Sequence, residues 1–238
     1  MPDKRTHRGP DPRDAKLFSA SAASQLRLAV ADYSLLLSKG YAEKSALKLV
    51  GDRFSLTARQ RIAVMRCACS DEQLEHRRKT CVPIENIAGR PIMIDGYNIL
   101  ITTEAALSNA VIFKGRDGCL RDIAGIHGTY RKVSETIPAF KLLGLFLDGI
   151  GVTEITWLLD SPVSNSGRLR KIMTQIAEGN NFNWQITLLQ NPDAELIKTD
   201  LTVATSDSVI LYKCQSWVNL LPALIKRRLT DTNIIDLS

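Results

Sequence analysis

The chain has 238 residues, of which 45% are hydrophobic and 24% are charged, the composition of a globular protein with a buried core. Its apolar runs fall short of the roughly 18 residues that span a membrane, and its charged N-terminus lacks the apolar segment of a signal peptide. We therefore expect a cytoplasmic protein with no membrane partner. Five scattered cysteines without a C-x-x-C pair argue against a zinc site and favour reduced thiols.

The formal net charge of +6 is unevenly distributed. Residues 1–90 carry a net charge of +7, whereas residues 91–238 carry −1. A basic region joined to a neutral region with clustered acids favours a nucleic-acid enzyme, in which one part binds phosphate and the other binds metal. The same distribution is compatible with a basic protein that has no polyanionic partner.

The N-terminal part of the chain predicts a tail followed by a helical domain. Residues 1–13 are rich in proline and charge and lack periodicity, which predicts a disordered tail. Residues 14–80 predict a small, basic, all-α domain. Apolar residues at helical spacing place its three helices at 15–38, 41–50 and 57–69.

The second and third of these helices resemble a helix-turn-helix, although a plain three-helix bundle has the same pattern. Thr57 is a good N-cap for the third helix. We expect Arg59, Arg66 and Lys44 to contact nucleic-acid phosphates without reading base sequence.

Residues 91–238 alternate between short apolar strands and amphipathic helices, after a linker at 81–90. This alternation predicts an α/β domain with a mostly parallel sheet and flanking helices. The expected strands are 91–95, 154–160, 184–190 and 201–206, with a short one at 110–113. The expected helices are 97–108, 131–149, 165–179, 193–198 and 216–229.

Three of these apolar strands end on an aspartate, at Asp95, Asp160 and Asp207. Because parallel strands deliver their carboxyl ends to one edge of the sheet, the three carboxylates should converge there. Ionised carboxylates about 4 Å apart repel by roughly 4 kcal/mol, so a cation or shared protons must stabilise them. Oxygen ligands favour Mg²⁺ or Mn²⁺. The alternative is that each aspartate is a turn residue or a helix cap.

Other polar residues near these strand ends have two interpretations. Asp193 follows the strand at 184–190 and either joins the acidic cluster or caps a helix. The loop after Asp160 leads into a helix and suits a phosphate, or its serines are ordinary N-caps. The candidates in that loop are Ser164, Ser166 and Arg168.

A long insertion, residues 111–128, separates the first two acidic strands. Its Asp117 and Asp122 are possible additional ligands, and Arg121 is a candidate phosphate clamp. Alternatively, these side chains pair with one another and hold the loop together.

Four motifs occur in the order found in one nuclease group. They are Asp95-Gly96-Tyr97-Asn98, Leu158-Leu159-Asp160, Pro192-Asp193-Ala194-Glu195 and Thr205-Ser206-Asp207. Over about residues 90–212, roughly half the chain, this set resembles the NYN branch of the PIN-like nucleases. The resemblance implies a Rossmann-like, PIN-like sheet and metal-dependent cleavage of nucleic acid, with RNA the commoner family substrate.

The resemblance also implies roles for individual residues. Asp95, Asp160, Asp207 and Asp193 would be the catalytic metal ligands, with Mg²⁺ or Mn²⁺ as cofactor. Asn98, Thr205 and Ser206 would contact the substrate or orient the carboxylates. We therefore expect a metal-dependent nuclease that acts on RNA. The alternative is a non-catalytic nucleic-acid-binding or regulatory protein with a degenerate nuclease-like domain.

Overall fold

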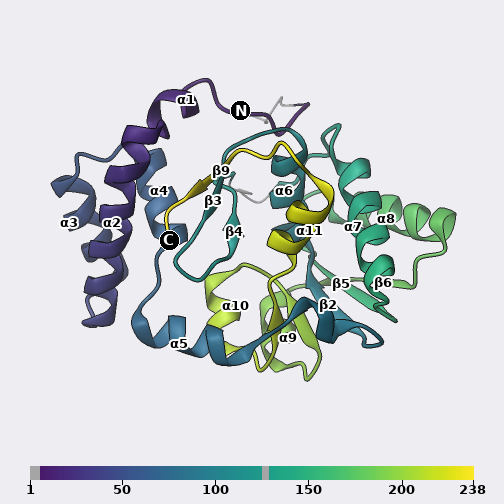
Figure 1. Ribbon diagram of the computed structural model, residues 1–238. Helices are drawn as coiled ribbons and strands as arrows, with labels where there is room; N and C mark the ends of the chain where they lie inside the picture. Colours follow the sequence, from purple (N-terminus) through teal and green to yellow (C-terminus); the bar gives the residue numbers. More distant parts are fainter. Residues whose placement is uncertain (1–5, 125–128) are drawn as a thin grey trace.

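The computed structural model describes residues 6–124 and 129–238. A group of N-terminal helices lies to one side of a parallel sheet, and a small second sheet lies between the two (Figure 1). Each side has its own hydrophobic core. The expected α/β class, with a helical N-terminal region, is confirmed.

The N-terminal helices differ from expectation in two places. They are α1 Asp14–Leu17, α2 Ala20–Ser38, α3 Glu43–Arg53, α4 Ala58–Cys67 and α5 Asp71–Thr80. The helix expected at 15–38 is split because Ser19 caps α2, its side chain accepting a hydrogen bond from the Ala22 amide. The charged stretch before residue 81 forms α5, which begins with a capping box between Ser70 and Gln73.

The predicted start of α4 is confirmed. Thr57 accepts a hydrogen bond from the Gln60 amide, and the Gln60 side chain accepts one from the Thr57 amide. Both α3 and α4 pack on α2, where Leu26 and Val64 are fully buried. This arrangement is compatible with either a helix-turn-helix or a plain bundle.

The insertion and the chain's C-terminal end form the second sheet. Its strands are β3 Ile112–Lys114, β4 Leu120–Arg121 and β9 Ile234–Asp236, with β3 in the middle. Phe113 of β3 packs edge-on against Phe18 at 4.7 Å between ring centroids. Leu237 is buried in the same N-terminal core. Residues 125–128 of the insertion lie outside the described part.

The main sheet has six parallel strands in the order β1-β8-β7-β2-β5-β6. They are β1 Cys81–Val82, β2 Ile92–Asp95, β5 Ile155–Asp160, β6 Trp184–Leu189, β7 Thr202–Ala204 and β8 Trp217–Val218. The prediction of a linker at 81–90 is wrong, because these residues contain the edge strand β1 and a 3₁₀ turn at Ile84–Ile87. Ile87 is fully buried in the core, which holds this segment on the sheet.

Helices cover both faces of the main sheet. The first face carries α6 Gly96–Leu107, α7 Thr136–Ile150, α8 Ser166–Asn180 and α11 Leu220–Arg228. The opposite face carries α9 Pro192–Lys198 and α10 Ser208–Lys213. Side chains alternate along β2: Ile92 and Ile94 belong to the first core and Met93 to the second. Asp95 therefore lies on the α9 side.

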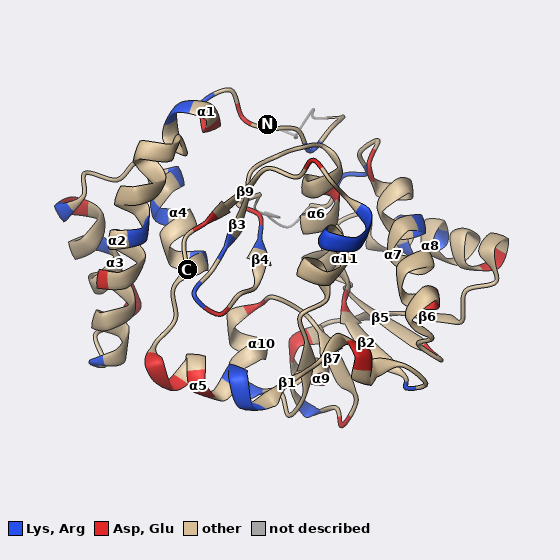
Figure 2. Cartoon of the chain, in the orientation of Figure 1, with Lys and Arg blue, Asp and Glu red and all other residues tan. Residues whose placement is uncertain are grey.

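Basic residues occur on both sides of the molecule. Lys and Arg lie on α3, α4 and α5 and also on α8 and α11 (Figure 2). Many carry carboxylate partners, such as the exposed pair Lys48–Asp52 and the buried pair Arg77–Asp117. The excess of positive charge in the first 90 residues therefore does not form a single surface of unpaired basic side chains.

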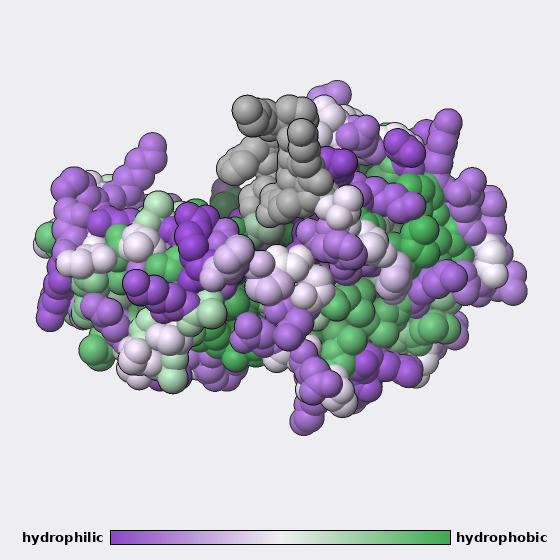
Figure 3. Space-filling view, turned by 90° about the horizontal axis from the view of Figure 1, so that it is seen from above, coloured by the Kyte–Doolittle hydropathy of each residue, from purple (hydrophilic) through white to green (hydrophobic). Residues whose placement is uncertain are grey.

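In the view from above, polar and apolar side chains are interspersed over the N-terminal helices, and larger apolar areas lie over the sheet side (Figure 3). Among the described residues, no helix has the length and apolarity that a membrane span requires.

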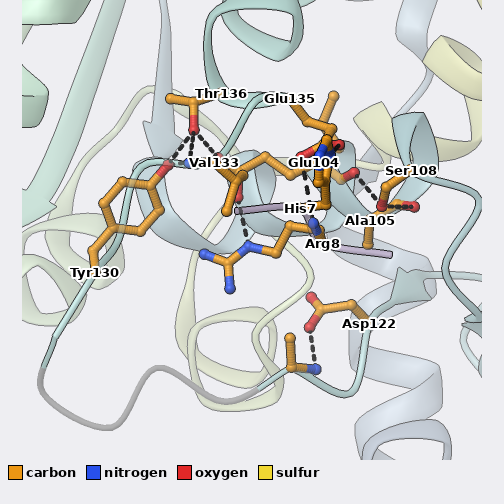
Figure 4. A network of polar contacts seen from close by, with 12 residues as sticks. His7, Arg8, Glu104, Ala105, Ser108, Asp122, Tyr130, Val133, Glu135 and Thr136 are labelled. Carbon is orange, nitrogen blue, oxygen red and sulfur yellow. Dashed lines mark hydrogen bonds and ion pairs between the residues drawn. The ribbon is translucent and has the colours of Figure 1, made fainter. Parts of the chain in front are cut away.

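The tail expected to be disordered is docked on the sheet domain from residue 6 onward; residues 1–5 lie outside the described part. The Arg8 Nε donates to Glu104 Oε2 at 2.8 Å, and His7 pairs with Glu135 (Figure 4). Glu104 is fully buried and also accepts hydrogen bonds from the hydroxyls of Tyr130 and Thr136. A buried carboxylate needs such partners, which explains why the tail is held.

Candidate functional site

The register of β2 and β5 places two of the predicted aspartates on the same face. Asp95 is opposite Leu158, and Asp160 lies two residues further along β5. Because side chains alternate along a strand, Asp160 shares the face of Leu158 and therefore of Asp95. β7 lies on the other side of β2, and its continuation carries Thr205 and Asp207 beyond the strand end.

Gly96 allows the first turn of α6 to approach β5 closely. A Cβ at this position would lie 2.6 Å from the Leu158 carbonyl oxygen and 2.6 Å from Leu159 Cδ2. Only glycine fits there without displacing the backbone of β5. The Asp95-Gly96 pair therefore sets the position of Asp95 at the strand end.

A chain of hydrogen bonds connects Asp95 to the segment after β7. Thr205 Oγ1 donates to Asp95 Oδ2 at 2.8 Å and accepts from the Asp207 amide at 3.0 Å. Asn98 Oδ1 accepts from the Ser206 amide at 2.8 Å and from the Ser206 hydroxyl at 2.9 Å. Thr205 and Ser206 are buried; in this structure Thr205 positions the Asp95 carboxylate and Ser206 holds the Asn98 side chain. Contact with substrate stays a prediction for both.

Asp207 also acts as a helix cap. Its Oδ1 accepts hydrogen bonds from the amides of Val209 and Ile210, at 2.8 and 3.2 Å, at the start of α10. In α9 the cap is Asn191, which accepts from the Ala194 amide. Asp193 is thus not the cap of its helix, and its side chain is exposed.

Burial raises the pKa of Asp95, Asp160 and Asp193, and neighbouring carboxylates add to the rise for Asp95 and Asp193. Burial raises the pKa of Asp95 to about 7; the Thr205 hydrogen bond opposes this rise, and the charges of Asp207 and Asp193 add to it. Although Asp193 as a whole residue is exposed, partial burial of its carboxylate raises its pKa, and the charges of Asp207 and Asp160 add to the rise. The pKa of Asp160 is raised by its own burial. The structure therefore brings Asp95, Asp160, Asp193 and Asp207 into one electrostatic cluster.

The chemistry of this cluster suits a hard cation. All four donors are carboxylates, and none forms an ion pair with a Lys, Arg or His in the part of the chain that the structure describes. Two hydroxyls near Asp160 are buried without a hydrogen-bond partner among the described residues. Tyr97 lies close to Asp160 in space, and Ser161 follows it in the sequence. Within residues 6–124 and 129–238, no three His, Cys, Asp or Glu side chains already stand in a metal-ligating arrangement.

Asp117 and Arg121 belong to a buried ion-pair network. Asp117 contacts Arg77 Nη1 at 2.5 Å and Arg121 Nη2 at 2.6 Å, and all three side chains are nearly inaccessible. Arg121 Nε donates to the Ser206 carbonyl at 2.7 Å, and Arg77 Nη2 donates to that of Ser208 at 3.2 Å. The interpretation of Asp117 as an extra ligand and of Arg121 as a phosphate clamp is wrong, because these groups hold the loop after β7.

Asp122 is likewise occupied. Its carboxylate accepts hydrogen bonds from Thr102 Oγ1 at 2.8 Å and from the Ala124 amide at 2.6 Å, and its side chain is buried. These contacts tie the insertion to α6. Asp122 is therefore not placed as a further ligand of the acidic cluster.

The serine N-caps predicted for the loop before α8 do not form. The residue at the cap position is Asn165, in the left-handed region at φ 71° and with no side-chain cap. Ser166 is buried and donates to the Ser161 carbonyl at 3.3 Å. Ser164 and Arg168 are exposed. Phosphate binding by this loop stays a prediction.

The three predicted nucleic-acid contacts do not form one free basic face. Arg59 makes two hydrogen bonds to the buried carboxylate of Asp14, at 2.6 and 2.8 Å. Arg66 Nη1 donates to the Asp122 carbonyl at 2.6 Å. Lys44 is exposed on α3. Two of these side chains thus connect parts of the protein.

Sequence reasoning missed Arg77, which is 1% exposed and supports the loop after β7. It lies within a charged run that has the pattern of a solvated helix face. Its partner Asp117 is 40 residues away, so no local signal in the sequence could have identified it.

Comparison with known proteins identifies the family but not the activity. Residues 84–223, more than half of the chain, match a family described as a domain of unknown function, DUF5616. The chain belongs to this family. Residues 25–80 match DUF434, described as a protein of unknown function. The DUF5616 region contains all four aspartates, and the DUF434 region runs from α2 to the end of α5.

A curated relative matches most of the chain. An uncharacterized protein of Methanocaldococcus jannaschii, MJ0935, is 30% identical over 180 residues, which cover 76% of this chain and 86% of the relative. No solved structure matches the chain.

Proposed function

We propose that this protein is a divalent-metal-dependent nuclease that cleaves RNA at the carboxyl edge of its parallel sheet. The observation that carries the proposal is the cluster of four carboxylates around Asp95, in which the charges of neighbouring aspartates help to raise the pKa of Asp95 and of Asp193 and none has a basic partner among the described residues. Such a cluster is destabilised by its own charge, and a bound cation would relieve that repulsion. The resemblance to PIN-like nucleases adds support.

Each residue has a defined part in this proposal. Asp95, Asp160, Asp193 and Asp207 would hold Mg²⁺ or Mn²⁺, which polarises a phosphodiester when bound. The Thr205 hydroxyl holds one oxygen of Asp95 and thereby orients the carboxylate. Since its raised pKa leaves Asp95 partly protonated near neutral pH, cation binding would compete with a proton there.

Calorimetric titration with Mn²⁺ tests this proposal without requiring a substrate. The wild type should bind Mn²⁺, and Asp95→Asn should bind it much more weakly. Asp148→Asn is the matched control, because Asp148 is an exposed aspartate on α7, on the opposite face of the sheet. If all three proteins fail to bind Mn²⁺ but still bind nucleic acid in a salt-sensitive way, the protein is a non-catalytic binding module.

A further inference from the structure

A cleft of about 350 Å³ lies between the N-terminal helices and the carboxyl edge of the main sheet. Leu37 of α2 and Met65 of α4 line it on the helical side. Asn98 of α6, Asp207 at the cap of α10 and Val209 within α10 line it on the sheet side. The cleft therefore borders the acidic cluster through Asp207, and both family regions contribute to it.

The lining of the cleft is mostly polar, but it includes apolar side chains that face solvent. Met65 is 43% exposed and Val209 is 53% exposed, although both lie in a concave site. Apolar side chains exposed in a cleft beside polar groups suit a ligand that has both kinds of surface, and the volumes of ligand sites start at about 300 Å³. The two side chains come from different elements and line the same cleft, so one ligand can contact both.

The polar groups of the cleft do not favour an anion. Arg66 and Arg121 belong to the lining, but so do Glu43, Asp122 and Asp207, and Arg121 is already paired with Asp117. A phosphate would meet more negative than positive charge there. The Asn98 side chain is different: its oxygen accepts from Ser206, whereas its NH₂ group makes no hydrogen bond to another described residue. A donor of this kind suits the polar edge of a neutral ring.

We propose that this cleft holds a nucleobase of a single-stranded substrate, next to the phosphate that lies at the acidic cluster. This inference rests on the proposed nuclease function and adds a substrate contact to it. The faces of the base lie against Met65 and Val209, and its polar edge meets the Asn98 amide. The N-terminal helices then bind substrate through an apolar wall, in addition to any contact that their basic residues make.

Fluorescence anisotropy with a short, labelled single-stranded RNA in EDTA tests the cleft without requiring cleavage. Met65→Glu places a charge in the cleft and should weaken binding about tenfold. Ile62→Glu is the matched control, because Ile62 is on the same helix, is 38% exposed and does not line the cleft. Since it adds the same charge, it reports general repulsion of the RNA and should weaken binding less than about twofold.

An abasic phosphodiester oligomer of the same length separates base contact from charge. It should bind the wild type more weakly than RNA does, and Met65→Glu should weaken its binding no more than Ile62→Glu does. Equal effects of the two substitutions on the RNA overturn the inference, as does a Met65→Glu effect that is the same for RNA and for the abasic oligomer. If Met65→Glu lowers the melting temperature, Met65→Gln replaces it with nearly the same shape.

The test of the base site does not depend on whether the protein is a nuclease. A Met65-specific effect on RNA binding in a protein that never cleaves RNA supports the base site and contradicts the proposed catalysis. Metal-dependent cleavage whose KM is the same in Met65→Glu and Ile62→Glu supports catalysis and contradicts the base site.

Discussion

Replacing Asp117 by Asn should destabilise the fold and displace the loop that carries Asp207. The Asp117 carboxylate is 1% exposed and contacts the guanidinium groups of Arg77 and Arg121, which are 2% and 6% exposed. Burial opposes its ionisation, but Arg121 and then Arg77 hold the pKa of Asp117 well below its usual range. The substitution removes the one anion that both cations share.

The expected loss is about 3–5 kcal/mol, the usual effect of removing one partner from a buried ion pair. Because Arg121 and Arg77 also hold the carbonyls of Ser206 and Ser208, the uncompensated cations should move and take this loop with them. The lowered pKa gives a pH signature as well. Stability from Asp117 is present above its unfolded pKa near 3.9, and the difference between wild type and variant should shrink as pH falls below that value.

Urea unfolding followed by tryptophan fluorescence measures this loss. Asp71→Asn is the matched control, because Asp71 also pairs with an arginine, Arg116, but is 71% exposed. It should cost no more than about 1 kcal/mol. A free energy of unfolding for Asp117→Asn within about 1 kcal/mol of the control would refute the reasoning, because a buried network would then behave as a surface ion pair.

Three further outcomes follow from single contacts. The raised pKa of Asp95 means that the native state retains a proton that the unfolded chain loses, so the free energy of unfolding should fall as the pH rises from about 4 to 7. Asp95→Asn should remove this fall, and thermal scans at pH 8 should show the variant to be more stable than the wild type. Arg8→Ala should lower the free energy of unfolding by about 1–3 kcal/mol, by leaving Glu104 without its cation, and should speed proteolysis of the tail. Thr57→Ala should cost about 1 kcal/mol in urea unfolding through loss of the Gln60 capping box.

The central strands could be predicted because each is an apolar run that stops at a polar residue. β2 and β5 are buried from both sides, so their hydrophobic pattern is continuous and their ends are sharp. The convergence of Asp95 and Asp160 then follows from parallel pairing. The edge strands β1 and β8 have two residues each, which is too short for any periodicity to appear.

The missed features depend on contacts between distant residues. α5 lies in a charged stretch where no helix is expected, because only Leu74 and Arg77 of it are buried. Arg8 meets Glu104 across 96 positions of sequence. The cleft beside Met65 exists only because the N-terminal helices pack next to the sheet edge. Local sequence patterns carry no information on these contacts.

Metal-dependent hydrolysis of a labelled single-stranded RNA tests the central claim most directly. With Mn²⁺ or Mg²⁺, wild type and Asp148→Asn should cleave the RNA at similar rates, and EDTA should stop both. Asp95→Asn should be slower by at least about a hundredfold while retaining its melting temperature or exceeding it. Cleavage by Asp95→Asn at the wild-type rate, or cleavage that persists in EDTA, would contradict the account.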